Sequence, residues 1–118
     1  MNANINGFGG LIAKAEAAGR EAAEACAPQM MCVKNGAGKV YGPFPVCGFA
    51  WVVVKPNRGK LADYLKKNAG FSKHWAGGIS NYISGYGQSL DMKAAHARAY
   101  AEVLREAGYD AYANSRID

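Results

Sequence analysis

The longest apolar run of the chain, Cys47–Val54, constrains the fold more than any other feature. It reads Cys-Gly-Phe-Ala-Trp-Val-Val-Val and lies between Pro45 and Pro56. β-branched and aromatic side chains dominate it and occupy both alternating faces, which is typical of a strand that is covered on both sides. A proline cannot donate to a sheet ladder, so the strand must end near these two residues. We therefore expect this run to form the central strand of a sheet.

Two patterns precede this strand. Residues 8–26 are rich in alanine and repeat apolar side chains at spacings of three and four, which is the period of one helix face. The face is narrow and mostly alanine, so a partner can approach it closely. That partner is either the core of the same chain or a second copy of the helix in a homodimer. Met30–Val33 and Lys39–Tyr41 flank the dipeptide Asn35-Gly36. Such a dipeptide supplies the positive φ angles of a tight turn and predicts a β-hairpin.

Helix caps mark two further elements after the central strand. Asn57 is placed to cap a helix over residues 58–69. Ser89 is placed to cap a longer helix over residues 90–107. A glycine follows each helix, where a left-handed residue commonly ends one. Two more strands are predicted, at residues 79–84 and 109–115.

These elements predict an α+β fold. We expect a mixed sheet of about four or five strands centred on Cys47–Val54, with two helices packed on it and an additional N-terminal helix. The 118 residues have the size of one domain. Its expected parts are a frayed end at residues 1–7, a helix at 8–26 and a sheet-and-helix body at 30–118.

Composition narrows the class of protein. Half of the residues are apolar and 19% are charged, which indicates a folded chain. No apolar stretch reaches the ~20 residues of a membrane span. The first residues lack the apolar core of a signal peptide, so we expect a cytoplasmic protein that does not bind membranes. Cys26, Cys32 and Cys47 form no C-x-x-C pair, and we expect them to be reduced and buried, with no metal or other cofactor bound.

Positive charge is concentrated in residues 55–74. This segment holds six Lys and Arg against one acid, Asp63, while the rest of the chain holds eight of each sign. The whole formal charge of +5 therefore belongs to it. A cluster of this kind neutralises phosphates, and neighbouring aromatic side chains stack on unpaired bases. The aromatic residues in or near the segment are Tyr64, Phe71, Trp75, Tyr82 and Tyr86.

We therefore expect a small non-catalytic nucleic-acid-binding protein, and the pairing of basic with aromatic residues suits single strands. The segment expected to bind is 55–75. The expected phosphate contacts are Lys55, Arg58, Lys60, Lys66, Lys67 and Lys73, and the expected stacking residues are Trp75 and Tyr86.

Other interpretations fit the same residues. Lys60, Lys66 and Lys67 also suit a solvated helix face. The same positive field suits a protein partner with an acidic surface, such as the target of an inhibitor or adaptor. The glycine-rich turn Gly85–Ser89 precedes a helix whose N-terminus suits a small anion or nucleotide. No HExxH, GxSxG or Cys/His pair is evident, so we do not expect an enzyme.

Overall fold

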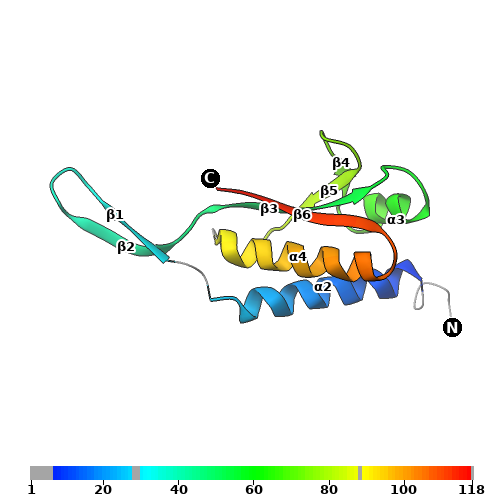
Figure 1. The fold of residues 1–118 in the computed structure, drawn as a ribbon, viewed down its shortest axis with the longest axis horizontal. Coiled ribbons are helices and arrows are strands. Elements are labelled where there is room, and N and C mark those ends of the chain that lie inside the picture. The colour runs from blue at the N-terminus through cyan, green and yellow to red at the C-terminus, as the bar shows by residue number, and fades with distance from the viewer. Residues whose placement is uncertain (1–6, 28–29, 88, 118) are drawn as a thin grey trace.

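The computed structural model describes residues 7–27, 30–87 and 89–117 of the chain (Figure 1). The end expected to fray lies outside these ranges, apart from Gly7. The α+β class is confirmed. In chain order the elements are α2 (Phe8–Ala25), β1 (Met30–Lys34), β2 (Val40–Pro45), β3 (Gly48–Lys55), α3 (Lys60–Asn68), β4 (Ser72–Lys73), β5 (Ile79–Tyr82), α4 (Leu90–Glu106) and β6 (Asp110–Ile117).

The main sheet has four strands in the order β4-β5-β3-β6. Strand β3 has neighbours on both sides, which confirms the central position expected for the apolar run. The sheet is antiparallel rather than mixed, because each neighbouring pair of its strands is antiparallel. Strands β5 and β6 do run in the same direction, joined through α4. They are not neighbours, since β3 lies between them and runs the opposite way.

The helices lie on one face of this sheet. Helix α4 packs along β3 and β6, and α2 packs on α4, so the body has the layers sheet, α4 and α2 (Figure 1). Leu65 of α3 joins the same core. The buried residues of α2 include Ala15, Gly19 and Ala23, whose small size lets the two helices approach closely. The alanine-rich face of α2 therefore packs into the core of the chain, and a homodimer contact through this helix stays a prediction.

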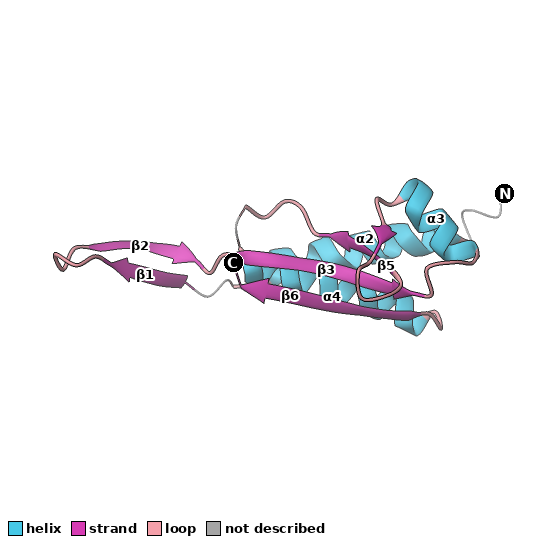
Figure 2. Ribbon diagram, turned by 90° about the horizontal axis from the view of Figure 1, so that it is seen from above, coloured by secondary structure: helices cyan, strands magenta, loops and turns pink. Residues whose placement is uncertain are grey.

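The β1–β2 hairpin forms a separate two-stranded sheet that projects from one end of the body (Figure 2). It gives the molecule an extent of 62 Å along its longest axis against 29 and 20 Å along the others. The hairpin is predicted correctly, but the positive φ angle of its turn is at Gly38, not in the Asn35-Gly36 dipeptide. Asn35 holds the turn by another route, because its Oδ1 accepts hydrogen bonds from the amides of Ala37 and Lys39, both at 2.9 Å.

Several of the remaining differences between the predicted and the observed elements are at helix ends. The Ser89 cap is confirmed, since Oγ of Ser89 accepts from the amide of Met92 at 3.3 Å. Asn57 does not cap α3, whose N-cap position is Gly59 at φ 109°. The short strand β4 was not predicted, because two residues are too few to show a period of two. The expectation that the cysteines are buried is wrong: Cys32 is exposed in the hairpin, and Cys26 and Cys47 are half-buried.

Candidate functional site

Among the described residues, no helix covers the sheet face opposite α4 (Figure 1). Side chains alternate along β3, so Ala50 and Val52 point into the core while Phe49 and Trp51 point to the other side. The register carries this alternation to the neighbouring strands, because residues paired across strands point the same way. We call this side the open face. It comprises Phe49, Trp51, Val53 and Lys55 of β3, Ser80 and Tyr82 of β5, and Asp110, Tyr112, Asn114 and Arg116 of β6. Of these, Trp51, Val53 and Ser80 are buried, and the others are exposed or half-buried.

Aromatic rings are the most prominent feature of the open face. Phe49 is 37% exposed and Tyr82 57% exposed, and Trp51 lies beneath, with its ring 5.3 Å from that of Tyr82. The turn between β4 and β5 adds Trp75, which is 85% exposed and is the most exposed large apolar side chain of the described residues. Large exposed rings on one side of a small protein indicate a binding surface. Their exposure to water is unfavourable, and a bound partner would bury them.

A pocket of about 280 Å³ lies between this turn and Tyr82. Lys73, His74 and Trp75 line it from the turn side, and Ser80 and Tyr82 from β5. The buried His74 fixes the turn, since its Nδ1 shares a 3.0 Å hydrogen bond with Oγ of Ser80. The turn also approaches the sheet closely. A Cβ on Gly78 would lie 2.5 Å from the carbonyl oxygen of Val54, so only glycine fits there.

Cations accompany the rings on this face. The guanidinium carbon of Arg116 lies 5.6 Å from the ring centre of Phe49. Nζ of Lys93 lies 5.8 Å from the same ring centre, but Lys93 is a buried residue of α4 and its Nζ donates to the carbonyl oxygen of Gly48. At the other end, Nζ of Lys55 lies 5.6 Å from the ring centre of Tyr112. These are cation–π distances. They keep positive charge within reach of any group that stacks on the rings.

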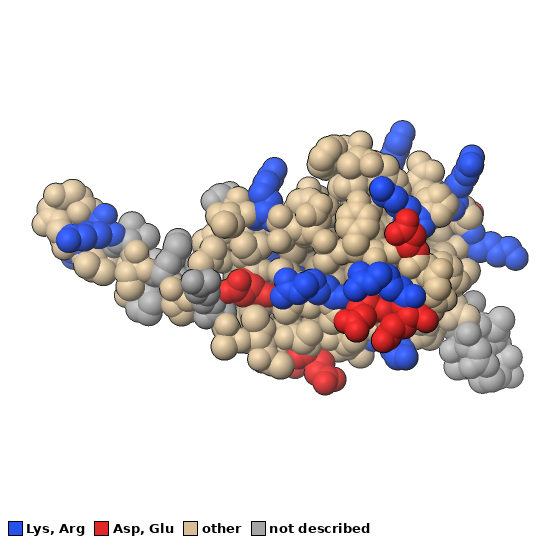
Figure 3. All heavy atoms as spheres, viewed as in Figure 1, with Lys and Arg blue, Asp and Glu red and all other residues tan. Residues whose placement is uncertain are grey.

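The structure brings three of the predicted site residues together at this face. Lys55 belongs to the open face itself, and Lys73 and Trp75 line the pocket beside it. The four other predicted phosphate contacts lie at the same end of the molecule, on or near α3: Arg58, Lys60, Lys66 and Lys67. Figure 3 shows Lys and Arg projecting from this end, whereas on the side of the body Lys and Arg lie next to Asp and Glu.

The α3 cations are partly engaged within the chain. Nζ of Lys66 donates to the carbonyl oxygen of Asn57 at 3.0 Å and lies 3.8 Å from Oδ1 of Asp63. Arg58 and Lys60 line a smaller pocket of about 140 Å³ against Pro56. The helix therefore presents both solvated and locally bonded cations.

Tyr86 lies apart from the other predicted stacking residue. Its hydroxyl shares a 2.8 Å hydrogen bond with Nδ1 of His96, on the helix side of β5. Of the other aromatic residues near the basic segment, Phe71 is buried in the core and Tyr64 packs against it, while Tyr82 reaches the open face.

The amides at the start of α4 are occupied as well. The amide of Leu90 donates to the carbonyl oxygen of Val46 at 2.8 Å, and those of Met92 and Lys93 donate to Ser89. The anion site expected at this helix start therefore lacks these donors.

Sequence reasoning missed Phe49 and Tyr112 as site residues. Phe49 was assigned to the buried strand, and Tyr112 to a terminal strand without a role. The signal that identifies them is the period of two in β3 and β6, combined with the knowledge that one sheet face has no helix. That last fact comes only from the three-dimensional arrangement.

Comparisons with known proteins add no family to this description. No protein-family model, curated protein or solved structure matches the chain. In the described residues no three His, Cys, Asp or Glu are grouped as metal ligands would be. None of the described helices is both long and apolar enough to cross a membrane.

Proposed function

We propose that this chain binds single-stranded nucleic acid on its open face. The observation that carries the proposal is the gathering of Phe49, Tyr82 and Trp75, all exposed, on the side of the sheet that no helix covers. Aromatic rings on a sheet surface stack on unpaired bases, and every base offers such a face. The bases of a duplex are already stacked and paired and offer no free face, so single strands are the preferred ligand.

The charges support the same ligand. Arg116 and Lys55 lie at opposite ends of the open face, and Lys73 lines the pocket between Trp75 and Tyr82. A strand whose bases stack across the face brings its phosphates within reach of these side chains. The lysines and arginine of α3 extend the positive surface at one end. The pocket of about 280 Å³ has the size to take one base between two rings.

Fluorescence anisotropy of labelled oligonucleotides tests the proposal. We expect single-stranded DNA or RNA to bind more tightly than a duplex of the same sequence, with affinity that falls steeply as salt rises. Tyr82→Ala and Trp75→Ala should each weaken binding by about 5- to 150-fold, the usual value of one stacked base. Tyr41→Ala is the matched control, since this exposed tyrosine lies on the hairpin. Equal loss in the control, or tighter binding of the duplex, would contradict the proposal.

The hairpin favours a second candidate, which is binding of a protein with an acidic surface. Its exposed side chains include Met30, Val40 and Tyr41, and it carries Lys34 and Lys39 but no acid. Exposed apolar groups beside a single sign of charge suit a complementary partner. This candidate predicts one protein partner captured by the intact chain and lost after Lys34→Glu and Lys39→Glu together, with nucleic-acid binding to the open face retained.

A further inference from the structure

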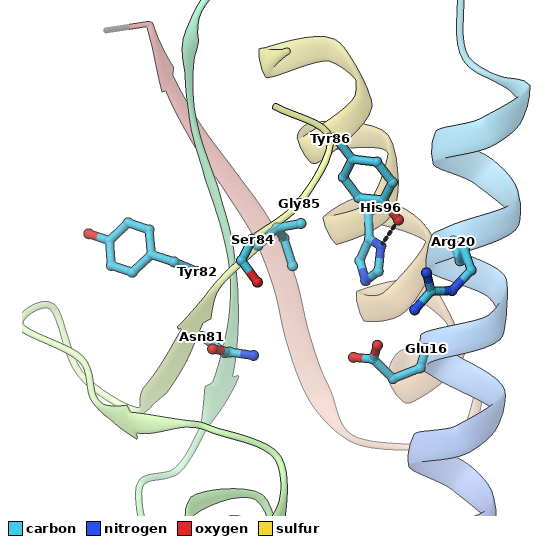
Figure 4. A pocket seen from close by; sticks show the side chains of 9 residues that line it. Glu16, Arg20, Asn81, Tyr82, Ser84, Gly85, Tyr86 and His96 are labelled. Atoms are coloured by element: carbon cyan, nitrogen blue, oxygen red, sulfur yellow. Dashed lines mark hydrogen bonds between the residues drawn. The ribbon is translucent and has the colours of Figure 1, made fainter. Parts of the chain in front are cut away.

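Another pocket, of about 260 Å³, lies on the helix side of β5 (Figure 4). Glu16 and Arg20 of α2 line it on one side, and Asn81 and Ser84 line it on the other, with His96 of α4 between them. The ring of Tyr82, which belongs to the open face, points away from this pocket in Figure 4. The pocket is therefore separate from the open face. The proposed nucleic-acid function makes no use of it.

His96 is held in one position at the back of this pocket. Its side chain is 6% exposed, and Nδ1 shares the 2.8 Å hydrogen bond with the hydroxyl of Tyr86. Its ring also stacks on that of Tyr100, with centres 6.2 Å apart. Burial lowers the pKa of His96 below its usual value, against the opposing effect of Glu16. The imidazole is therefore neutral at pH 7, and it adds no net charge to the pocket.

Two locally unfavourable residues keep His96 in this place. Gly19 lies in the interior of α2, where glycine is less favourable than alanine. A Cβ at this position would lie 2.6 Å from Cδ2 of His96. Tyr86 has a φ of 60°, a left-handed conformation that is strained for a residue with a side chain of this size. Unfavourable features that converge on one group are more typical of a functional site than of packing alone.

The pocket also holds two opposite charges that are not paired with each other. Glu16 and Arg20 lie one helical turn apart, a spacing at which such residues commonly form an ion pair. In the part of the chain that the structure describes, Glu16 and Arg20 form no ion pair with each other. In Figure 4 both side chains instead extend into the pocket, toward Asn81 and Ser84. A simple anion would be repelled by Glu16, and a simple cation would be repelled by Arg20.

We propose that this pocket binds a small zwitterion of the free amino-acid type. The guanidinium of Arg20 receives the carboxylate of the ligand, and the carboxylate of Glu16 receives its ammonium group. Ser84 supplies hydrogen bonds from the opposite wall, where Nδ2 of Asn81 already donates to the carbonyl oxygen of Ala69 at 3.2 Å, and the neutral His96 closes the back. Each ligand charge then meets one opposite charge, so the occupied pocket contains no unpaired ion.

Thermal unfolding of the full chain with each standard amino acid at millimolar concentration tests this proposal. A ligand that binds only the folded chain raises Tm, so we expect at least one amino acid to raise it by several degrees. The N-acetyl and carboxamide derivatives of that amino acid should produce no shift, because each lacks one charge. A panel in which no amino acid changes Tm would overturn the proposal.

Matched variants locate the binding. Arg20→Gln and Glu16→Gln should each reduce the affinity for the amino acid at least tenfold. Lys14→Gln should leave it unchanged, because Lys14 is an exposed residue of the same helix that does not line the pocket. A shift that persists in both pocket variants would also overturn the proposal. None of the three substitutions touches the open face, so nucleic-acid binding is a separate readout.

Discussion

Gly19 and His96 occupy adjoining space between α2 and α4, and neither can be changed independently of the other. Alanine at position 19 would gain about 1 kcal/mol from helix propensity. It would also place a Cβ 2.6 Å from the imidazole, and overpacking of this kind costs about 1–3 kcal/mol. We therefore expect Gly19→Ala to lower the free energy of unfolding, as measured by urea denaturation. In a His96→Ala background the same substitution should raise it, and a loss of stability there would contradict the account.

The buried His96 also predicts a dependence of stability on pH. The folded chain lowers the pKa of His96, so below about pH 6.5 the unfolded chain binds the proton more readily. The free energy of unfolding should therefore fall as pH falls through this range, until the folded imidazole is protonated as well. The groups that face the ring are Tyr86, Tyr100, Glu16 and Arg20. His96→Asn should flatten the profile between about pH 7.5 and pH 5.5, and parallel profiles for the two proteins would argue against this cause.

Among the elements, the β1–β2 hairpin is the one that contributes least to the body. In the described residues its packing is mainly between its own two strands, and such a hairpin is marginally stable alone. Met30 and Pro45 are paired at its base, so a two-residue Asn-Gly turn between them can replace residues 31–44. We expect this variant to keep its Tm within a few degrees in calorimetry. A large fall in Tm would show that the hairpin supports the core.

Most elements could be predicted because their signals are local. The apolar run of β3, the alanine period of α2 and the Ser89 cap of α4 each depend on residues within a few positions of one another. The direction of the strands could not be predicted, because it depends on β3 lying between β5 and β6. The prediction that Asn57 caps α3 is wrong, because Gly59 occupies the N-cap position of this helix.

For the whole molecule, the candidate site was predicted only in part. The cluster of charge indicated Lys55 and Lys73, and the aromatic residue beside it indicated Trp75, since all three are close in sequence. It did not find Phe49 or Tyr112, because they join the site through strand pairing and through the absence of a helix on that face. The molecule is elongated. The open face lies along one side of the body, and the hairpin projects from one end of it (Figures 1 and 2).

The central claim is that the uncovered side of the sheet is the binding surface. Titration of the isotope-labelled chain with an unlabelled single-stranded oligonucleotide, followed by backbone chemical shifts, tests it most directly. We predict that the largest shifts will fall on β3, β5 and β6 and on the β4–β5 turn, with Phe49, Trp75 and Tyr82 among them. Shifts confined to α2 and α4, or no shifts at near-physiological salt, would contradict the claim.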